Sequence, residues 1–260
     1  MYKFTTKTIR EIAVEMPLTT GIFEEFKIDY CCGGRKPFAE ACESAGVNPQ
    51  VVSQKIEDAL KVFGGNYETG YAGKQTATDL INYILEKHHV FTMHEIERLT
   101  ALMDKVCRKH GAQHTELFDL QATFQALSDD LTVHMRKEET VLFPFIKTLE
   151  MSLSQNLSVA PPHFRTVQNP VRMMMLEHDT AGGLFRKMHE LSNDFALPDG
   201  ACPSFGALYF GFRELEKDLH RHIHLENNVL FPQAVEMEQK VFGQEFSKSD
   251  TNYACQPFCS

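Results

Sequence analysis

Two copies of one short motif could bring imidazole and carboxylate side chains to the same metal ion. His134 and Glu138 stand four residues apart, and His222 and Glu226 repeat that spacing, because 222 minus 134 and 226 minus 138 are both 88. The same Val-Leu-Phe-Pro sequence closes both copies without a gap. Four residues turn an α-helix by about 400°, so both side chains of a copy emerge on one face. We therefore predict that the two motifs converge on one metal centre.

The helix expected before each motif carries a further histidine. His88 shares a helix face with the apolar residues around Ile84, and His178 occupies the corresponding place in the second half. The offset between them is 178 minus 88, or 90, close to the 88 of the motifs. His89 competes with His88 for the same role, but it lies about 100° further round an α-helix. The angular positions favour His88.

The same angular comparison sorts the crowded region around the second motif. His220 and His224 stand two residues either side of His222, about 200° away on an α-helix, and so belong to the opposite face. Glu139 is likewise rotated away from His134 relative to Glu138. Six inward candidates remain, and all four expected helices contribute to them: His88, His134, Glu138, His178, His222 and Glu226.

This set of side chains favours a pair of non-haem irons. A single His-x-x-x-Glu is usually a contact on a helix surface, but buried imidazoles and carboxylates without a partner would be costly. Nitrogen and oxygen ligands suit iron, manganese or zinc rather than a metal that prefers thiolate. Six ligands are too many for one ion, and zinc usually takes four. Two carboxylates can bridge two ions. A histidine-rich bundle without metal is the alternative.

Apolar periodicity predicts an all-α fold built on an internally duplicated four-helix bundle over residues 76–240. No stretch alternates at period two for long enough to suggest a sheet. The polar segment 150–170 reads as a crossover or exposed loop. The four expected helices cover roughly 77–109, 113–149 with an interruption or end near Pro144, 171–195, and 203–240.

A small helical domain is expected over residues 1–62, before the bundle. It contains Asp-Tyr-Cys-Cys-Gly-Gly at positions 29–34, where the double glycine forces a turn. Cys31 and Cys32 in such a turn would be partly exposed, and so reactive, oxidisable or able to transfer metal; the alternative is two small residues that fill the turn. Residues 63–75, with four glycines, read as a linker, and residues 241–260 as an irregular tail holding Cys255 and Cys259.

Composition narrows the class of protein. The net charge of −9 and the scattered basic residues argue against a nucleic-acid surface. No apolar run approaches the roughly 20 residues of a membrane span, and the N-terminus lacks the pattern of a secretion signal. Seven cysteines, two of them adjacent, do not form a disulfide framework. We therefore expect a cytoplasmic protein.

The cysteine turn and the two His-x-x-x-Glu motifs together resemble the iron–sulfur cluster repair di-iron proteins, in which a Cys-Cys-Gly-Gly domain precedes a haemerythrin-like four-helix bundle. The resemblance covers most of the chain but not the tail. It implies seven ligands, five histidines and two bridging glutamates. It also selects His110, which from the sequence alone competes with His114. The implied ligands are His88, His110, His134, Glu138, His178, His222 and Glu226.

The resemblance also implies a function. Such proteins repair clusters damaged by nitric oxide or reactive oxygen, by donating iron from a carboxylate-bridged di-iron centre. The partners would be damaged iron–sulfur proteins and small diatomic ligands, with Cys31 and Cys32 as reactive residues. The alternatives are a haemerythrin-type oxygen carrier or sensor and an enzyme that reduces nitric oxide or peroxide. A simple carrier would not need the cysteine turn. A homodimer is compatible with the sequence, which does not set the oligomeric state.

Overall fold

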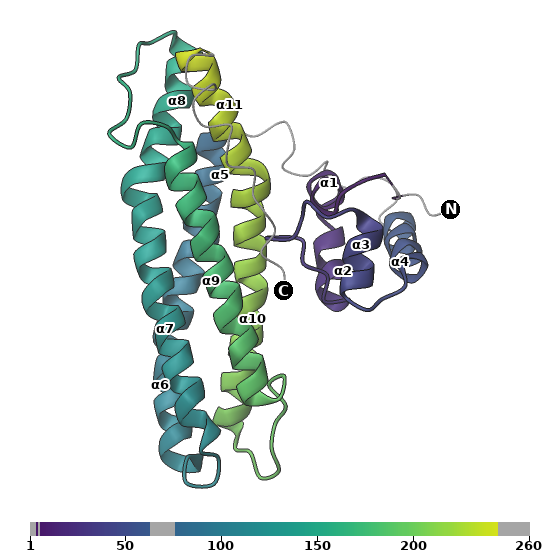
Figure 1. The fold of residues 1–260 in the computed structure, drawn as a ribbon. Helices are drawn as coiled ribbons and strands as arrows, with labels where there is room; N and C mark the ends of the chain where they lie inside the picture. The colour runs from purple at the N-terminus through teal and green to yellow at the C-terminus, as the bar shows by residue number, and fades with distance from the viewer. Residues whose placement is uncertain (1–3, 5, 63–75, 244–260) are drawn as a thin grey trace.

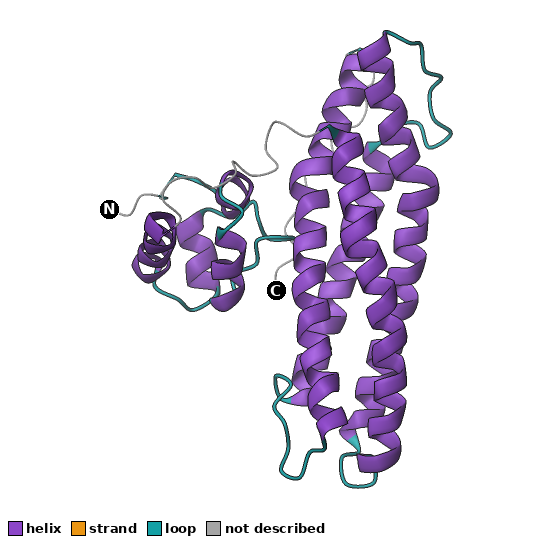
Figure 2. Ribbon diagram, turned by 180° about the vertical axis from the view of Figure 1, so that it is seen from behind, coloured by secondary structure: helices purple, strands orange, loops and turns teal. Residues whose placement is uncertain are grey.

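The computed structural model describes residue 4, residues 6–62 and residues 76–243. It confirms the all-α prediction, since the described residues contain helices and one isolated bridge between Thr8 and Pro37 but no strand. A small group of helices lies beside a long bundle, near the middle of its length (Figures 1 and 2). The predicted linker, 63–75, and the tail from residue 244 onward lie outside the described residues.

The small N-terminal module has its own apolar core, formed by residues such as Ile9, Phe23, Phe38 and Ile56. Its first helix begins with a capping box, in which Thr8 and the glutamate three residues on satisfy each other's backbone N–H groups. The four helices of the module are α1 (Ile9–Glu15), α2 (Thr19–Glu25), α3 (Phe38–Ser44) and α4 (Pro49–Val62).

The bundle consists of four rods, in which α7 packs on α9 and α6 packs on α10. The second rod continues through Pro144 to Gln155, beyond the predicted end near residue 149, so the long connection covers only 156–167. In chain order the rods are α5 (Ala77–Tyr83), η1 (Ile84–His89) and α6 (Val90–His110); α7 (Glu116–Lys137), η2 (Glu138–Leu142) and α8 (Phe143–Gln155); α9 (Gln168–Ser192); and α10 (Pro203–Leu225), η3 (Glu226–Leu230) and α11 (Phe231–Phe242).

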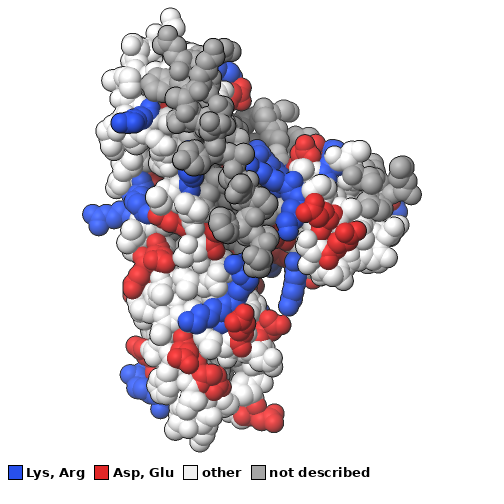
Figure 3. Space-filling view, viewed as in Figure 1, with Lys and Arg blue, Asp and Glu red and all other residues white. Residues whose placement is uncertain are grey.

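Two apolar clusters fill the bundle and leave a polar layer between them. One cluster includes Leu99, Phe124 and Phe212, and the other includes Ile81 and Ile146. Apart from His110, the predicted histidines and glutamates of both repeats fall between these two clusters along their rods. Apolar packing on both sides therefore fixes the helices that hold the polar layer. On the face in Figure 3, acidic and basic side chains are interspersed over the bundle.

Three of the four rods change from α to π geometry at this polar layer. The N–H group of Phe143 bonds to the carbonyl of Glu138, and the N–H group of Phe231 bonds to the carbonyl of Glu226, each five residues back. Val90 bonds to Leu85 in the same way. Such π turns are rare and are found mostly at functional sites. The backbone hydrogen bonds therefore span five residues instead of four where the candidate ligands lie.

The proline that follows each motif frees a carbonyl. Proline has no N–H and cannot bond to the residue four positions earlier, which is Asn228 for Pro232. The carbonyl of Asn228 instead accepts a hydrogen bond from Arg10 Nη2 of the N-terminal module, at 2.9 Å. The Asn228 side chain donates to the carbonyl of Tyr30 at 3.1 Å. The second repeat is thus one half of the junction between the module and the bundle.

The face of α10 that carries His220 and His224, which the angular comparison placed opposite His222, completes this junction. The rings of His220 and His224 lie 6.4 and 5.4 Å from the ring of Tyr30. Arg221 pairs with Glu24, whose carboxylate also accepts the Tyr30 hydroxyl. These histidines hold the N-terminal module on the bundle.

Candidate metal centre

The structure brings six side chains from all four rods into two overlapping groups. The first group is His89, Glu138, His222 and Glu226, and the second is His134, Glu138, His178 and Glu226. Within each group the ligand atoms lie within 4.8 Å of one another. Glu138 and Glu226 belong to both groups and are fully buried. The arrangement offers two ion positions with two shared carboxylates.

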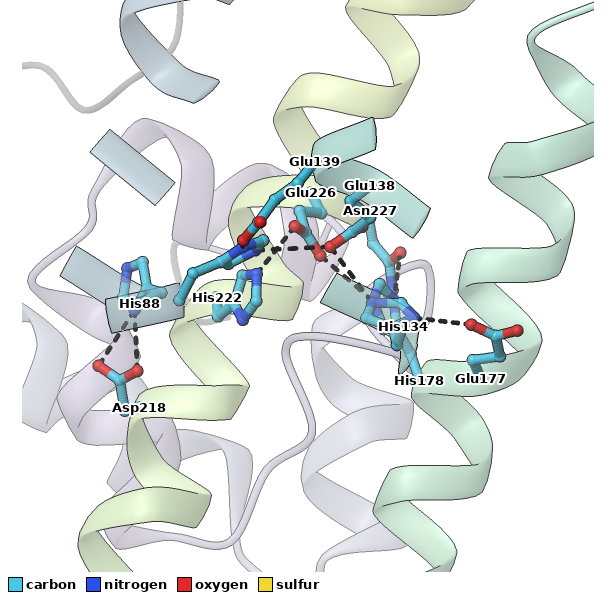
Figure 4. A network of polar contacts seen from close by, with 11 residues as sticks. His88, His134, Glu138, Glu139, Glu177, His178, Asp218, His222, Glu226 and Asn227 are labelled. Carbon is cyan, nitrogen blue, oxygen red and sulfur yellow. Dashed lines mark hydrogen bonds and ion pairs between the residues drawn. The ribbon is translucent and has the colours of Figure 1, made fainter. Parts of the chain in front are cut away.

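Each carboxylate reaches one histidine of either group (Figure 4). Glu226 lies 2.8 Å from His222 Nε2 and 3.2 Å from His178 Nε2. Glu138 lies 3.4 Å from His134 Nε2 and 3.5 Å from His89 Nε2. Both glutamates therefore lie between the two groups, beside a histidine of each.

The ring orientations show that two histidines present lone pairs to one point. His134 Nδ1 lies 2.8 Å from Glu177, and His178 Nδ1 lies 3.0 Å from the Asn227 side-chain oxygen. These oxygens accept hydrogen bonds, so in a neutral ring Nδ1 carries the proton and Nε2 keeps a lone pair. The two Nε2 atoms are 3.0 Å apart. Two neutral rings would repel each other at that distance, so a metal ion or, in the metal-free layer, a proton must lie between them.

The other group also leaves buried polar atoms without a partner. His89 donates from Nδ1 to Glu139 Oε1 at 2.8 Å, which directs Nε2 toward Glu138. His89 Nε2 and both Glu138 oxygens are buried and make no hydrogen bond to any described residue. Unpaired buried groups of this kind are expensive. A metal ion would satisfy them, so these residues fit a metal centre.

Charges in the metal-free layer are strongly coupled. Burial lowers the pKa of His89, but the carboxylates of Glu138, Glu226 and Glu139 outweigh it and raise the pKa to about 8. Burial likewise lowers the pKa of His178, yet Glu226, Glu138 and the nearby Cys32 raise it to about 9. The layer therefore holds protons at neutral pH that a metal ion must displace.

The structure does not place His88 in either group, contrary to the prediction. His88 Nδ1 faces Asp218 at 3.0 Å, and its ring stacks on His222 with centroids 5.4 Å apart. The prediction assumed 100° per residue, but η1 has hydrogen bonds over five residues and turns less per residue. His89, which the sequence disfavoured, therefore faces the centre.

The structure also separates His110 from the centre. His110 ends α6, which begins directly after His89 and contains 21 residues. At 1.5 Å per residue the two histidines are roughly 30 Å apart along the helix. The seventh ligand implied by the resemblance therefore does not lie near either group.

The cysteine turn is held by one carboxylate and packs against the bundle. Asp29 accepts hydrogen bonds from the backbone N–H groups of Cys31 and Cys32, both at 3.0 Å, and from that of Gly33 at 2.9 Å. Cys31 is only 7% exposed and belongs to an apolar cluster of the bundle, so the expectation of a partly exposed pair holds only for Cys32. The two sulfur atoms lie 3.7 Å apart.

Sequence reasoning missed the residues that orient the histidines. Glu139 and Asn227, which accept hydrogen bonds from His89 and His178, each follow a glutamate shared by the two groups, and 227 minus 139 is 88. The repeat could have found them. It also favours His89 over His88, since 178 minus 89 is 89 and closer to 88 than 90.

Comparisons with known proteins cover most of the chain. The hemerythrin HHE cation-binding domain matches residues 80–234, and the ScdA_N domain, described as a domain of unknown function (DUF542), matches residues 5–60. The chain is 30% identical over 235 residues to the iron-sulfur cluster repair protein YtfE of Yersinia pseudotuberculosis serotype IB (strain PB1/+). It is equally similar to the protein of that name from Yersinia pestis (strain Pestoides F). Each alignment covers 90% of this chain and 99% of the relative.

Within the described residues, no helix has the length and apolar character that crossing a membrane requires.

Proposed function

The chain belongs to the family of haemerythrin-like iron–sulfur cluster repair proteins, and we propose on this basis that it repairs clusters damaged by nitrosative or oxidative stress. The observation that carries the proposal is the buried layer in which Glu138 and Glu226 each reach a histidine of both groups. Such a layer would supply ligands for two ions. Its clients would be damaged iron–sulfur proteins.

We propose iron as the resident metal. The ligand set contains four imidazoles and two carboxylates and no thiolate, and it provides for two ions rather than one. Bound iron would supply cycling between ferrous and ferric states. The role of the chain is to orient the ligands, as Glu139, Glu177 and Asn227 do through the histidine Nδ1 atoms, and to exclude water by burial.

The position of the cysteine turn supports iron donation. Cys32 lies close enough to His178 for its charge to help raise the pKa of that histidine. Cys31 is buried against the bundle beside it, and several effects raise its pKa, first the hydrogen bond with Cys32 and then burial. Iron passing outward as cargo would meet these two sulfur atoms, one buried and one partly exposed.

A second function, reaction with a small diatomic molecule such as nitric oxide or oxygen, is favoured by the apolar surroundings. Phe143 lies 5.8 Å from the ring of His89, and Phe231 lies 6.2 Å from that of His178. A neutral diatomic molecule can enter such surroundings with little desolvation cost.

The five described cysteines are all free, which supports a cytoplasmic location.

Metal analysis of freshly purified protein tests the centre. We expect about two irons per chain, because two ligand groups share two carboxylates. The matched variants are His89→Gln, which removes a ligand, and His88→Gln, which changes the adjacent histidine outside both groups. One zinc per chain, or no metal at all, would contradict the di-iron proposal.

Transfer of labelled iron tests donation. The loaded protein is mixed with a client whose cluster has been damaged by nitric oxide, and recovery of the cluster is followed together with the label. We expect transfer without turnover, slowed when Cys31→Ser and Cys32→Ser are combined and unchanged in the control Cys42→Ser. Rapid consumption of nitric oxide with a supplied reductant, and no transfer, would favour the enzyme instead.

A further inference from the structure

A cavity lies where the N-terminal module meets the second repeat of the bundle. Its volume is about 460 Å³, which falls within the range of small-molecule sites. The module supplies most of the lining, and the bundle supplies one residue; the polar and charged side chains among them are Thr8, Arg10, Glu11, Glu15, Arg35 and Asn228. On the face in Figure 3, basic side chains gather at this junction. Three separate segments of the chain therefore form the cavity.

Two guanidinium groups line this cavity without a carboxylate partner. Arg10 Nη2 donates to the carbonyl of Asn228 at 2.9 Å, which is its one side-chain hydrogen bond to a described residue. Arg35 is exposed, and its side chain makes no hydrogen bond or ion pair within the described residues. A guanidinium group has five N–H donors. Most of the donors at this cavity are therefore free for a ligand.

The two carboxylates in the cavity wall are engaged elsewhere. Glu11 accepts hydrogen bonds from the backbone N–H group and the hydroxyl of Thr8, at 2.8 and 3.0 Å. Glu15 pairs with Lys7. Within the described residues, neither carboxylate forms an ion pair with either guanidinium group. With the lysine included, these side chains carry three positive charges and two negative ones, so the surroundings favour an anion.

The two positive charges also act on each other. Burial lowers the pKa of Arg10, and the charge of Arg35 lowers it further, although Glu11 raises it in part. Like charges held at one cavity repel each other. An anion that contacts both guanidinium groups would replace this repulsion by attraction.

The backbone holds the two arginines beside each other. The N–H group of Arg10 donates to the carbonyl of Gly34 at 2.7 Å, directly before Arg35 in the chain. A Cβ atom on Gly34 would lie 2.8 Å from the carbonyl of Tyr30, so only glycine permits this close approach. The positions of both arginines are thus fixed before any ligand binds, which lowers the entropy cost of binding.

We propose that this cavity binds a small organic anion that carries at least two carboxylate or phosphate groups. Guanidinium groups bind both kinds of anion through paired N–H···O hydrogen bonds. One anionic group takes the free N–H groups of Arg10, and the second takes those of Arg35. Because Arg10 is also bonded to Asn228 of the bundle, the ligand strengthens the junction between the module and the bundle.

The site is separate from the metal centre. Asn228, the one bundle residue among the charged and polar groups of the cavity, belongs to neither ligand group of the centre. The inference therefore does not rest on the proposed repair function, and anion binding can be measured independently of metal content.

Isothermal titration calorimetry of the full, metal-loaded chain at low ionic strength tests the site. Succinate has two carboxylates and is compared with acetate, which has one; phosphoenolpyruvate has a phosphate and a carboxylate and is compared with inorganic phosphate. We expect a probe with two groups to bind about tenfold or more tightly than its single-group match, and added salt to weaken this binding. Which of the two binds more tightly identifies the anionic groups. Metal content is measured after each titration, so that loss of metal is not counted as binding.

Replacement of Arg35 tests the assignment to this cavity. Arg35→Gln should weaken binding of the tighter probe about tenfold or more, because one anionic group loses its partner. Arg35→Lys keeps the charge without the paired donors and should restore part of the affinity. Arg172→Gln, at an exposed position on α9, is the matched control and should bind as the parent does. Equal affinity in Arg35→Gln and Arg172→Gln would overturn the proposal, as would two-group probes that bind no more tightly than their matches.

Alkylation of Cys31 reports on the junction itself. Ligand at a concentration that saturates the parent should slow this alkylation several-fold, because the bound anion ties Arg35 and Arg10 together where the module contacts the bundle. The same concentration should leave the rate unchanged in Arg35→Gln, and circular dichroism confirms that this variant is folded. An unchanged rate in the saturated parent would overturn the inference that the ligand strengthens the junction.

Discussion

The two repeats of the bundle carry the same inward side chains, but their outward faces differ. In the first repeat the residue two positions after Glu138 is Thr140, which is exposed. In the second repeat the corresponding residue is Asn228, which is buried beneath the N-terminal module and bonds to Tyr30. Each repeat has the π turn and the following proline. Duplication thus kept the ligand geometry, and only one copy acquired a docking surface.

A second difference concerns the groups that orient the histidines. His134 donates its Nδ1 proton to Glu177. The repeat places His88 where Glu177 would be, and there it stacks on His222, whose Nδ1 makes no hydrogen bond to a described residue. His88 Nδ1 instead bonds to the carboxylate of Asp218. His134 is therefore oriented by a carboxylate, whereas the corresponding His222 is oriented by ring stacking.

The largest effect is expected from the shared glutamates, which tie the two repeats together. Replacing both Glu138 and Glu226 by leucine should abolish metal binding and the spectral signature of coupled irons, because no carboxylate remains to bridge. Metal content and the absorption spectrum measure this, with the exposed Asp130→Asn as control. A surviving coupled signature would show that the bridge lies elsewhere.

Next in size is the exchange between neighbouring histidines of the first rod. His89→Gln should lower metal affinity by at least the ten- to hundredfold typical of weaker, orienting contacts, because it deletes a ligand of one group. His88→Gln should keep both metals and lower the affinity by less, since His88 lies outside the groups and acts on them only through the ring of His222. Metal titration of the two variants measures the difference. Equal losses of metal affinity in the two variants would show that the π turn does not determine which histidine binds the metal.

A smaller effect is expected at the docking surface, which only the second repeat has. Asn228→Ala removes the amide that donates to the carbonyls of Tyr30 and Cys31 and should destabilise the protein by about 1–3 kcal/mol. Thr140→Ala, at the matched position, should change stability by less than about 0.5 kcal/mol. Urea unfolding measures both. Alkylation of Cys31 should speed up only in Asn228→Ala, and an equal rate in both variants would argue against docking through this residue.

The smallest effect concerns protons in the two halves. The pKa of His89 is raised to about 8 and that of His178 to about 9 in the metal-free layer, so both are charged at pH 7. Loading metal at pH 7 should therefore release about two protons, falling toward none by pH 10. Their charged forms stabilise the metal-free fold fully below about pH 6.5, and this contribution is lost as pH rises through 8 to 9. Indicator dyes and thermal unfolding measure the two effects, which would be absent if the histidines were already neutral.

The repeat can be read along the chain, and it led to five residues that the structure brings together. His134, Glu138, His178, His222 and Glu226 all fell into the groups that the structure forms. Helical spacing and duplication suffice for that, as does apolar periodicity for the four rods. The structure differs from the predicted ligand roles of His88 and His110 for two different reasons. At His88, the π turn changes the rotation per residue along the helix. The length of α6 places His110 roughly 30 Å from His89.

The amino-acid sequence by itself determined the fold class, the repeat and the kinds of ligand. Only the tertiary structure decided that His89 faces the centre, that Asn228 receives the N-terminal module, and that His110 packs against Phe205. The physical reason is common to all three. Periodicity fixes which residues share a face within one regular helix, whereas contacts across a π turn or between distant helices depend on packing that spacing alone does not encode.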